Sequence, residues 1–381
     1  MSREQAIAFI RQVLAAARRR DIARLMEFYA DEAVAVSPVF GTVSGRSAIA
    51  TTWERLFSTF ADFDMEVTNV LVDANRIAVL GTVRTTDRLG WFGLPATGGL
   101  ISYRLVLLFT VADGKIVHDE RIYDLTGVLE RLEKARLDKE LQTAADVQRA
   151  LLTRSTHAGS FCESVGDSVP CRAIGGDFFE FVELPSGDVG VAMGDVAGKG
   201  PPSALLAAMV QGMFAAEAHA GRGPAATLAR MNQQLAARHL ESRFATLVYA
   251  VLSPDGRLAY SNAGHNPPAL VTSNGTRRLT VGGTILGAFA DATFQEDTFH
   301  LRDRDTLVMF TDGVTEARNA RDEEFGEDRL MACLVADVQS PAVLLKRIFA
   351  AVRDFSEQAD QSDDMTVTIT RLVNRGLKGQ I

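Results

Sequence analysis

Four aspartates in the C-terminal half of the sequence have the residue type and spacing to hold a cation. Each lies where an apolar, strand-like run meets a turn: Asp177 in GGDFF, Asp195 in GDVAGKG, Asp312 in FTDGVTE and Asp363 in QSDDMT. Folding could bring them to one end of a sheet, where packed carboxylates need protons, basic partners or cations. Oxygen ligands without a cysteine or histidine cluster favour Mg²⁺ or Mn²⁺ over Zn²⁺. Each aspartate taken alone is equally compatible with capping a turn or a helix.

The order of the segments around these aspartates resembles one protein family. From about residue 140 onward the sequence contains, in family order, ADVQRALL, AIGGDFFEF, GDVAGKGPPSALL, FATLVYAVLSPDGRLAYSNAGHNPPAL, ILGAF, DTLVMFTDGVTEARNARDEEFGEDRL and QSDDMTVTITRL. These segments are similar to those of metal-dependent serine/threonine phosphatases of the protein phosphatase 2C-like (PPM) superfamily, in its bacterial SpoIIE-type branch. The resemblance implies a four-layer αββα sandwich that hydrolyses phosphoserine or phosphothreonine with metal-activated water.

The resemblance also implies a role for each acid. Asp195 would bridge two divalent cations, Mn²⁺ or Mg²⁺, and the backbone carbonyl of Val196 would complete one coordination shell. Asp177 would serve the outer metal, and Asp312 and Asp363 the inner one. Two cations about 3.5–4 Å apart lower the pKa of a shared water, which supplies hydroxide for in-line attack on a phosphoryl group.

Four further residues are secondary candidates. Asp364 adjoins Asp363 and ranks below it, because the family ligand is usually the first acid of the pair. Lys199 precedes a proline-started helix and could hold the phosphoprotein substrate, although an exposed loop lysine is the commoner case. Arg172 could grip phosphate, and this rests only on its nearness in sequence to the first aspartate. His265 in NAGHNPP could be a general acid, but its Gly and Pro neighbours favour a turn-organising role.

Residues 1–125 are predicted to form a separate α+β cone. Residues 4–34 suggest two amphipathic helices, and strand-like runs follow at MEVTNVLV, RIAVLGTVRTT, ISYRLVLLFTV and KIVHDERIYD. The segments FYADEAVAVSPVFGTVSGRSAI and GKIVHDERIYDLTGVLERL resemble the SnoaL-like branch of the nuclear transport factor 2-like superfamily. That superfamily includes enzymes and noncatalytic domains, so we expect a sensory or dimerising role, and an independent small-molecule enzyme stays open.

Aromatic residues of this domain could line a pocket for a small-molecule ligand, although large aromatics at such positions usually belong to a core. The candidates are Phe28, Tyr29, Trp53, Trp91 and Tyr103. In the last strand, His118 and Asp119 suggest acid/base chemistry, but the sequence identifies no second partner for them.

Residues 126–154 are predicted to be a helical linker, charged and without Gly or Pro after Gly127. Alternating spacings of four and three resemble a short coiled-coil seam formed by Leu137, Leu141, Ala144, Gln148 and Leu151. Such a seam would make the protein a homodimer. A surface helix docked on its own domain is the close alternative.

Composition predicts a soluble, cytoplasmic protein with several domains. The chain has 381 residues and 47% hydrophobic content, and no apolar stretch approaches the roughly 20 residues that span a bilayer. The amphipathic N-terminus is unlike a signal peptide. Three cysteines without zinc-type pairing indicate reduced thiols. A net charge of −8 argues against nucleic acid as a partner.

Together these features predict a cytoplasmic signalling phosphatase that is regulated by its N-terminal domain. The phosphatase domain is expected at residues 155–376. By family resemblance, its substrate is a phosphorylated STAS-type anti-anti-sigma factor. The alternative is a ligand-responsive scaffold whose phosphatase fold has lost activity. The four intact acids argue against that alternative.

Overall fold

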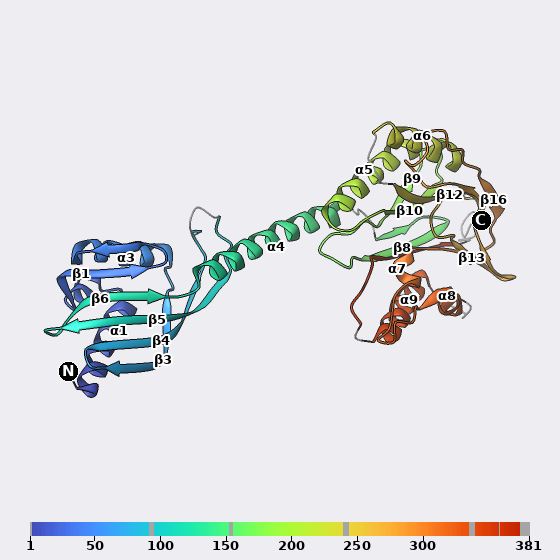
Figure 1. Ribbon diagram of the computed structural model, residues 1–381. Coiled ribbons are helices and arrows are strands. Elements are labelled where there is room, and N and C mark those ends of the chain that lie inside the picture. The colour runs from blue at the N-terminus through green and yellow to red at the C-terminus, as the bar shows by residue number, and fades with distance from the viewer. Residues whose placement is uncertain are drawn as a thin grey trace, which may run out of the picture. The chain divides into compact units, whose positions relative to one another are not determined.

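The computed structural model describes residues 2–90, 95–151, 155–238, 244–334, 340–357 and 359–373. Trp91 therefore lies outside the described residues. The chain divides into two compact units, Met1–Glu140 and Leu141–Ile381, and helix α4 (Leu125–Leu151) contributes to both (Figure 1). In the described part of the chain, no helix is long and apolar enough to cross a membrane.

The N-terminal unit is built on one six-stranded sheet with the order β2-β1-β6-β5-β4-β3. Its strands are β1 (Tyr29–Ser37), β2 (Gly41–Ser44), β3 (Asp64–Asp73), β4 (Arg76–Thr86), β5 (Leu100–Ala112) and β6 (Lys115–Ile122). Strands β3 to β6 form an antiparallel meander, and β1 joins it in parallel with β6. Three helices share its core: α1 (Arg3–Arg19), α2 (Ile22–Met26) and α3 (Arg46–Thr59). The α+β architecture confirms the prediction for this unit.

Local sequence explains how α1 begins and which face it buries. The Ser2 side chain accepts a hydrogen bond from the Gln5 backbone, and the Gln5 side chain accepts one from the Ser2 backbone, which is a capping box. Along the helix, Ile10 and Val13 are buried at helical spacing against the sheet. The predicted helical spacing is confirmed for α1, whereas residues 29–34, which the sequence suggested as helix, form the start of strand β1.

The C-terminal unit contains two six-stranded sheets. The first has the order β15-β12-β11-β10-β9, with β16 also paired to β12, and the second has the order β14-β13-β17-β18-β8-β7. The strands of the first are β9 (Phe178–Glu183), β10 (Val189–Val196), β11 (Ala245–Leu252), β12 (Arg257–Ala263), β15 (Gly282–Gly283) and β16 (Asp297–His300). Those of the second are β7 (Thr156–Ala158), β8 (Cys162–Val169), β13 (Ala269–Thr272), β14 (Gly275–Arg278), β17 (Thr306–Phe310) and β18 (Met365–Leu372).

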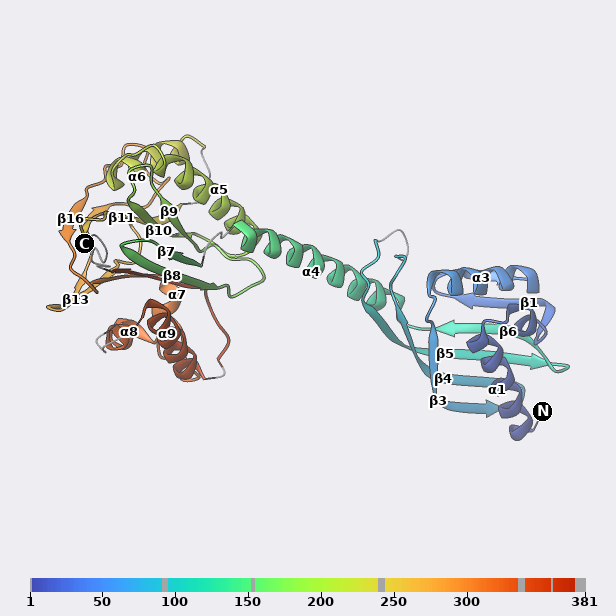
Figure 2. The same cartoon turned by 180° about the vertical axis from the view of Figure 1, so that it is seen from behind.

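Three apolar cores stack this unit into four layers (Figure 2). Helices α5 (Pro201–Ala218) and α6 (Pro224–Ala236) cover the first sheet, and helices α8 (Gly326–Leu334) and α9 (Pro341–Ser356) cover the second. The middle core lies between the sheets and includes Met193 of β10 and Met309 of β17. Ala192, the neighbour of Met193, belongs to the helix-side core instead, because successive strand residues face opposite ways. The predicted αββα sandwich is confirmed.

Helix α4 contributes side chains to both units. Val128 and Leu132 pack in the N-terminal unit. Leu141 and Ala145 pack in the C-terminal unit against Ile174 and Ala204. Of the predicted seam residues, Leu137 and Leu151 are about half exposed, at 46% and 47%. Leu141 and Gln148, by contrast, contact their own chain. The homodimer stays a prediction.

Candidate metal centre

Strand ends of both sheets bring the predicted acids together. Gly194 of β10 pairs with Phe178 of β9, so Asp195 near the end of β10 and Asp177 just before β9 lie at the same edge. In the facing sheet, Phe310 of β17 pairs with Val367 of β18. Just beyond that pair, β17 leads into α7 (Asp312–Thr315), and the Asp363–Asp364 pair comes directly before β18. The sequence predicts one end of a sheet, and the fold uses the adjoining ends of two.

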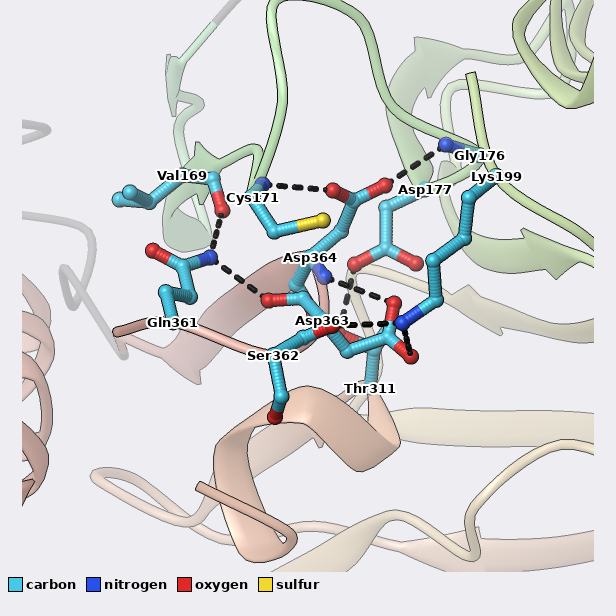
Figure 3. Close-up of polar contacts among 10 residues, drawn as sticks. All are labelled: Val169, Cys171, Gly176, Asp177, Lys199, Thr311, Gln361, Ser362, Asp363 and Asp364. Atoms are coloured by element: carbon cyan, nitrogen blue, oxygen red, sulfur yellow. Dashed lines mark hydrogen bonds and ion pairs between the residues drawn. The ribbon is translucent and has the colours of Figure 1, made fainter. Parts of the chain in front are cut away.

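Two threonine hydroxyls hold Asp177, which directly precedes β9: Thr311 directly follows β17, and Thr366 lies in β18. Thr311 Oγ1 donates to Asp177 Oδ2 at 2.7 Å (Figure 3), and Thr366 Oγ1 donates to the same oxygen at 2.7 Å. The Thr366 backbone N–H donates in turn to Thr311 Oγ1 at 2.9 Å. Asp177 is only 4% exposed, and burial, followed by the nearby charge of Asp195, raises its pKa well above the usual range. Its carboxylate is therefore fixed in place and poorly solvated.

The remaining acids repel one another in the same way. Burial and the charges of Asp312 and Asp363 raise the pKa of Asp195 to about 6. Burial and Asp363 also raise the pKa of Asp312. Because deprotonation of each carboxyl disfavours that of its neighbours, the cluster attracts protons or cations.

The adjacent acids Asp363 and Asp364 have different partners. Asp364 is buried, and its two oxygens accept backbone hydrogen bonds from Cys171 at 2.8 Å and Gly176 at 2.7 Å. Asp363 has a side chain that is 38% exposed, and its Oδ2 lies 2.8 Å from Lys199 Nζ (Figure 3). Carboxylate oxygens of both, with Cys171 Sγ, lie within 4.8 Å of one another. This arrangement supports Asp363 as the cation ligand and Asp364 as a residue that holds the loop.

The three basic candidates lie in different settings. Lys199 Nζ also hydrogen-bonds the Ser362 carbonyl, so its ammonium group lies against the acidic cluster. Arg172 Nη1 lies 3.8 Å from where a Cβ on Gly200 would stand, which places the guanidinium beside the start of α5. His265 is buried, its Nδ1 lies 2.8 Å from Thr246 Oγ1, and burial lowers its pKa to about 4. A neutral, enclosed imidazole supports the turn-organising role.

Comparisons with known proteins identify the two predicted kinds of domain. Residues 185–373 match the family model Stage II sporulation protein E (SpoIIE), and residues 10–119 match the SnoaL-like domain. The chain joins a SnoaL-like domain to a SpoIIE-type domain.

Two curated proteins show how far the similarity extends. The chain is 30% identical over 185 residues to phosphoserine phosphatase RsbU of Bacillus subtilis, which covers 48% of this chain and 55% of that protein. It is 27% identical over 227 residues to protein IcfG of Synechocystis sp., which covers 52% of this chain and 36% of that protein. The chain thus spans about half, or less, of the length of these curated relatives.

A solved structure supports the fold of the same region. The SiaA-PP2C domain of Pseudomonas aeruginosa matches with a TM-score of 0.55 at 19% identity, covering 63% of this chain and 98% of that one. At this level of identity the likeness supports the architecture.

The donors of the SpoIIE-type domain fit hard divalent cations. Its acids offer carboxylate oxygens, which Mg²⁺ and Mn²⁺ prefer. A Cβ added to Gly176 would lie 2.8 Å from the Val196 carbonyl oxygen and 3.4 Å from Asp195 Oδ1. Only glycine leaves that carbonyl and that carboxylate accessible side by side, as the predicted ligand set requires.

Sequence reasoning missed the hydroxyls and amides that support the acids. Thr311, Thr366 and Gly176 each bind an acid of the cluster, and Gln148 binds the loop beside it. A signal existed for the threonines, because Thr311 directly precedes Asp312 and Thr366 begins the alternating TVTIT run. No local pattern links Gln148 to the acids.

The SnoaL-like domain encloses a cavity of about 320 Å³. Trp53 and Tyr103 line it as predicted, whereas the lining does not include Phe28 or Tyr29, which are buried in the core. Arg121 also lines the cavity, with its guanidinium 4.4 Å from the centre of the Trp53 ring.

Behind the cavity, the sequence-predicted Asp119 is fully buried. Its Oδ2 accepts hydrogen bonds from Tyr29 Oη at 2.9 Å and from Arg121 Nη2 at 3.0 Å. Asp119 thus has two partners that the sequence did not identify. With one of them, Arg121, it forms a buried ion pair. His118 lies on the same strand but lines a separate pocket, so the two residues do not form one site.

Proposed function

We propose that the SpoIIE-type domain is a metal-dependent protein serine/threonine phosphatase. The observation that carries the proposal is the cluster of carboxylates at the adjoining strand ends, where burial and neighbouring acids raise the pKa values of Asp177, Asp195 and Asp312. The 30% identity over 185 residues to RsbU, a phosphoserine phosphatase, supports the same activity. The substrate would then be a phosphorylated side chain that reaches this edge of the sandwich.

The cations would be two Mn²⁺ or Mg²⁺ ions. Asp195 would bridge them, with Val196 O and Asp177 on one side and Asp312 and Asp363 on the other. When bound, they would supply an activated water and neutralise charge on the phosphoryl oxygens. The threonine hydroxyls on Asp177 would keep that carboxylate oriented while the cluster changes charge.

Lys199 and Arg172 would act on the substrate. Lys199 lies on the exposed side of the cluster, where its side chain is 40% exposed, and it can reach a phosphoryl oxygen by leaving Asp363. Arg172, beside the start of α5, offers a second cation at the same edge. Both would bind phosphate by charge-assisted hydrogen bonds.

The physiological substrate is proposed to be a STAS-type anti-anti-sigma factor in sigma-factor regulation. Family resemblance supports this partner, and the cavity in the SnoaL-like domain supports regulation by a small molecule. A cytoplasmic homodimer is the proposed form of the protein. Light scattering across micromolar concentrations tests the dimer, and a monomer throughout would contradict it.

Hydrolysis of a phosphorylated STAS-type protein with Mn²⁺ tests the activity. Asp195→Asn should lower turnover by about a thousandfold or more, because the proposed bridge between the cations loses its charge. Asp188→Asn is the matched control, since Asp188 is a half-buried acid in the hairpin turn before the same strand and accepts a hydrogen bond from Ser186 rather than contacting the cluster. Full activity in Asp195→Asn, or turnover without metal, would contradict the two-metal mechanism.

Hydrolysis of p-nitrophenyl phosphate tests the active site independently of the proposed protein substrate. Hydrolysis of this small ester without hydrolysis of the STAS-type protein would change the partner only. A wild-type protein that binds Mn²⁺ but hydrolyses neither substrate would favour the alternative, a ligand-responsive scaffold.

A further inference from the structure

Helix α4 presents one side chain to the loop that leads into the acidic cluster. Gln148 Nε2 donates to the Gly175 carbonyl at 2.7 Å, and the Gly175 N–H donates to Gln148 Oε1 at 3.2 Å. A primary amide that donates to and accepts from one residue fixes the orientation of that backbone. Gly175 lies two residues before Asp177, so this contact is made at the entrance to the cluster.

The loop is held equally tightly on its other side. Asp364 Oδ2 accepts from the Gly176 N–H at 2.7 Å. A Cβ on Gly175 would lie 2.4 Å from Asp364 Oδ2, and one on Gly176 would lie 2.8 Å from Val196 O. The two glycines therefore fit a narrow space between α4, Asp364 and the end of β10. A shift of the loop would move it away from Val196 O and would turn Asp177.

Packing fixes the part of α4 that carries Gln148. One turn earlier, Ala145 is 2% exposed and packs with Ile174 and Ala204. Three residues later, the Leu151 carbonyl accepts a hydrogen bond from Gln211 Nε2 of α5 at 3.1 Å. Because the helix is anchored on both sides of Gln148, its amide is positioned before it meets the loop.

We propose that Gln148 is a positioning residue of the metal centre, which rests on the proposed metal-dependent function. It holds Gly175 and Gly176 so that the Asp177 carboxylate and the Val196 carbonyl face the cations. The last turns of α4 are then a working part of the site, although 27 positions separate Gln148 from Gly175 in the sequence.

Measuring Mn²⁺ binding to the whole 381-residue chain tests whether Gln148 positions the metal ligands. Gln148→Ala should weaken Mn²⁺ binding by about ten- to a hundredfold, as loss of a residue supporting metal ligands typically does. Gln148→Glu keeps the size of the side chain but has no N–H for the Gly175 carbonyl, and it should also weaken binding. Gln142→Ala is the matched control, because Gln142 is exposed on the same helix and its amide donates to Asp146. The control should bind Mn²⁺ within twofold of wild type.

Isothermal titration gives the dissociation constants, and thermal unfolding in chelator gives the stability without added metal. A positioning role predicts that the Mn²⁺ concentration for half-maximal p-nitrophenyl phosphate hydrolysis rises, while turnover at saturating Mn²⁺ recovers. A purely structural role predicts a lower melting temperature with unchanged Mn²⁺ affinity. If Gln148→Ala does not fold, Gln148→Glu carries the same comparison.

Each outcome decides the proposal. Unchanged Mn²⁺ affinity in the Gln148 variants, with wild type binding normally, would overturn this inference and leave the proposed phosphatase standing. An equal loss in Gln142→Ala would also overturn it, because the effect would belong to the helix as a whole. A wild-type chain that binds no Mn²⁺ would overturn the metal centre itself.

Discussion

The two units of the chain bury carboxylates in opposite ways. In the SnoaL-like domain, Asp119 is fully buried and its charge is matched by Arg121 and a hydrogen bond from Tyr29. In the SpoIIE-type domain, burial and neighbouring acids raise the pKa values of Asp195 and Asp312, and Lys199 pairs with Asp363. A buried acid with its own cationic partner holds a fold together. A cluster with too few cationic partners is suited to binding metal.

Breaking the matched pair should produce the largest change in stability. Arg121→Met leaves Asp119 charged and buried, so the free energy of unfolding should fall by about 3–5 kcal/mol. Both tryptophans of the chain, Trp53 and Trp91, lie in the N-terminal unit, so their fluorescence during urea unfolding reports on this domain.

The double variant Asp119→Leu with Arg121→Met is the control for that measurement. Removing both charges leaves no unpaired ion, so it should lose less stability than Arg121→Met alone. A loss of less than about 1 kcal/mol in the single variant would show that Asp119 does not depend on Arg121.

Metal should stabilise the SpoIIE-type domain, which contains the acidic cluster, and should not stabilise the SnoaL-like domain. At Mn²⁺ concentrations about a hundredfold above the dissociation constant, the free energy of unfolding of the SpoIIE-type domain should rise by about 2.7 kcal/mol. Differential scanning calorimetry with Mn²⁺ and then with chelator checks this. Asp312→Asn should remove most of the shift, and the Arg121→Met variant should retain it. A shift of equal size in Asp312→Asn would place the cation elsewhere.

Much of the fold was predictable because its signals are local. Alternation along β4 and β5 and the helical spacing in α1 follow from burial of one face. Helix α3 was not predicted. Its N-cap residue, Gly45, offers no side-chain cap, and its interior contains two adjacent β-branched threonines. The repeat of Ile49, Trp53 and Phe57 at spacings of four is the signal that could have identified it.

The acids of the site could be predicted from their motifs, but the residues that hydrogen-bond to them could not. Thr311 and Thr366 are 134 and 189 positions from Asp177, so only the pairing of β17 with β18 brings both to it. The partner of Asp119 was missed for another reason. Arg121 is two residues away on the same strand, on the same face, and a charged pair at that spacing usually lies on a solvated surface.

Removing a threonine hydroxyl that donates to Asp177 should have a smaller effect than removing an acid of the cluster. Thr366→Val removes one donor to Asp177 while keeping the shape, and hydrogen bonds to charged groups contribute about 1.5–3 kcal/mol. We expect Mn²⁺-dependent hydrolysis to fall roughly tenfold, which corresponds to about 1.4 kcal/mol. Thr370→Val is the control, because Thr370 lies on the same strand and donates to Ser164 instead. Equal losses in both variants would assign the effect to strand packing.

Lys199→Gln should have the smallest effect on stability and still change the chemistry. Its pair with Asp363 is about 40% exposed, and such pairs contribute less than about 1 kcal/mol. If the ammonium group binds the substrate phosphoryl group, the KM for a phosphoprotein should rise severalfold while the melting temperature stays constant. Lys346→Gln removes the same charge from an exposed position on α9 and controls for long-range attraction. An unchanged KM in Lys199→Gln would restrict Lys199 to its contact with Asp363. Lys199 would then be a partial counterion of the kind that Arg121 supplies in full to Asp119.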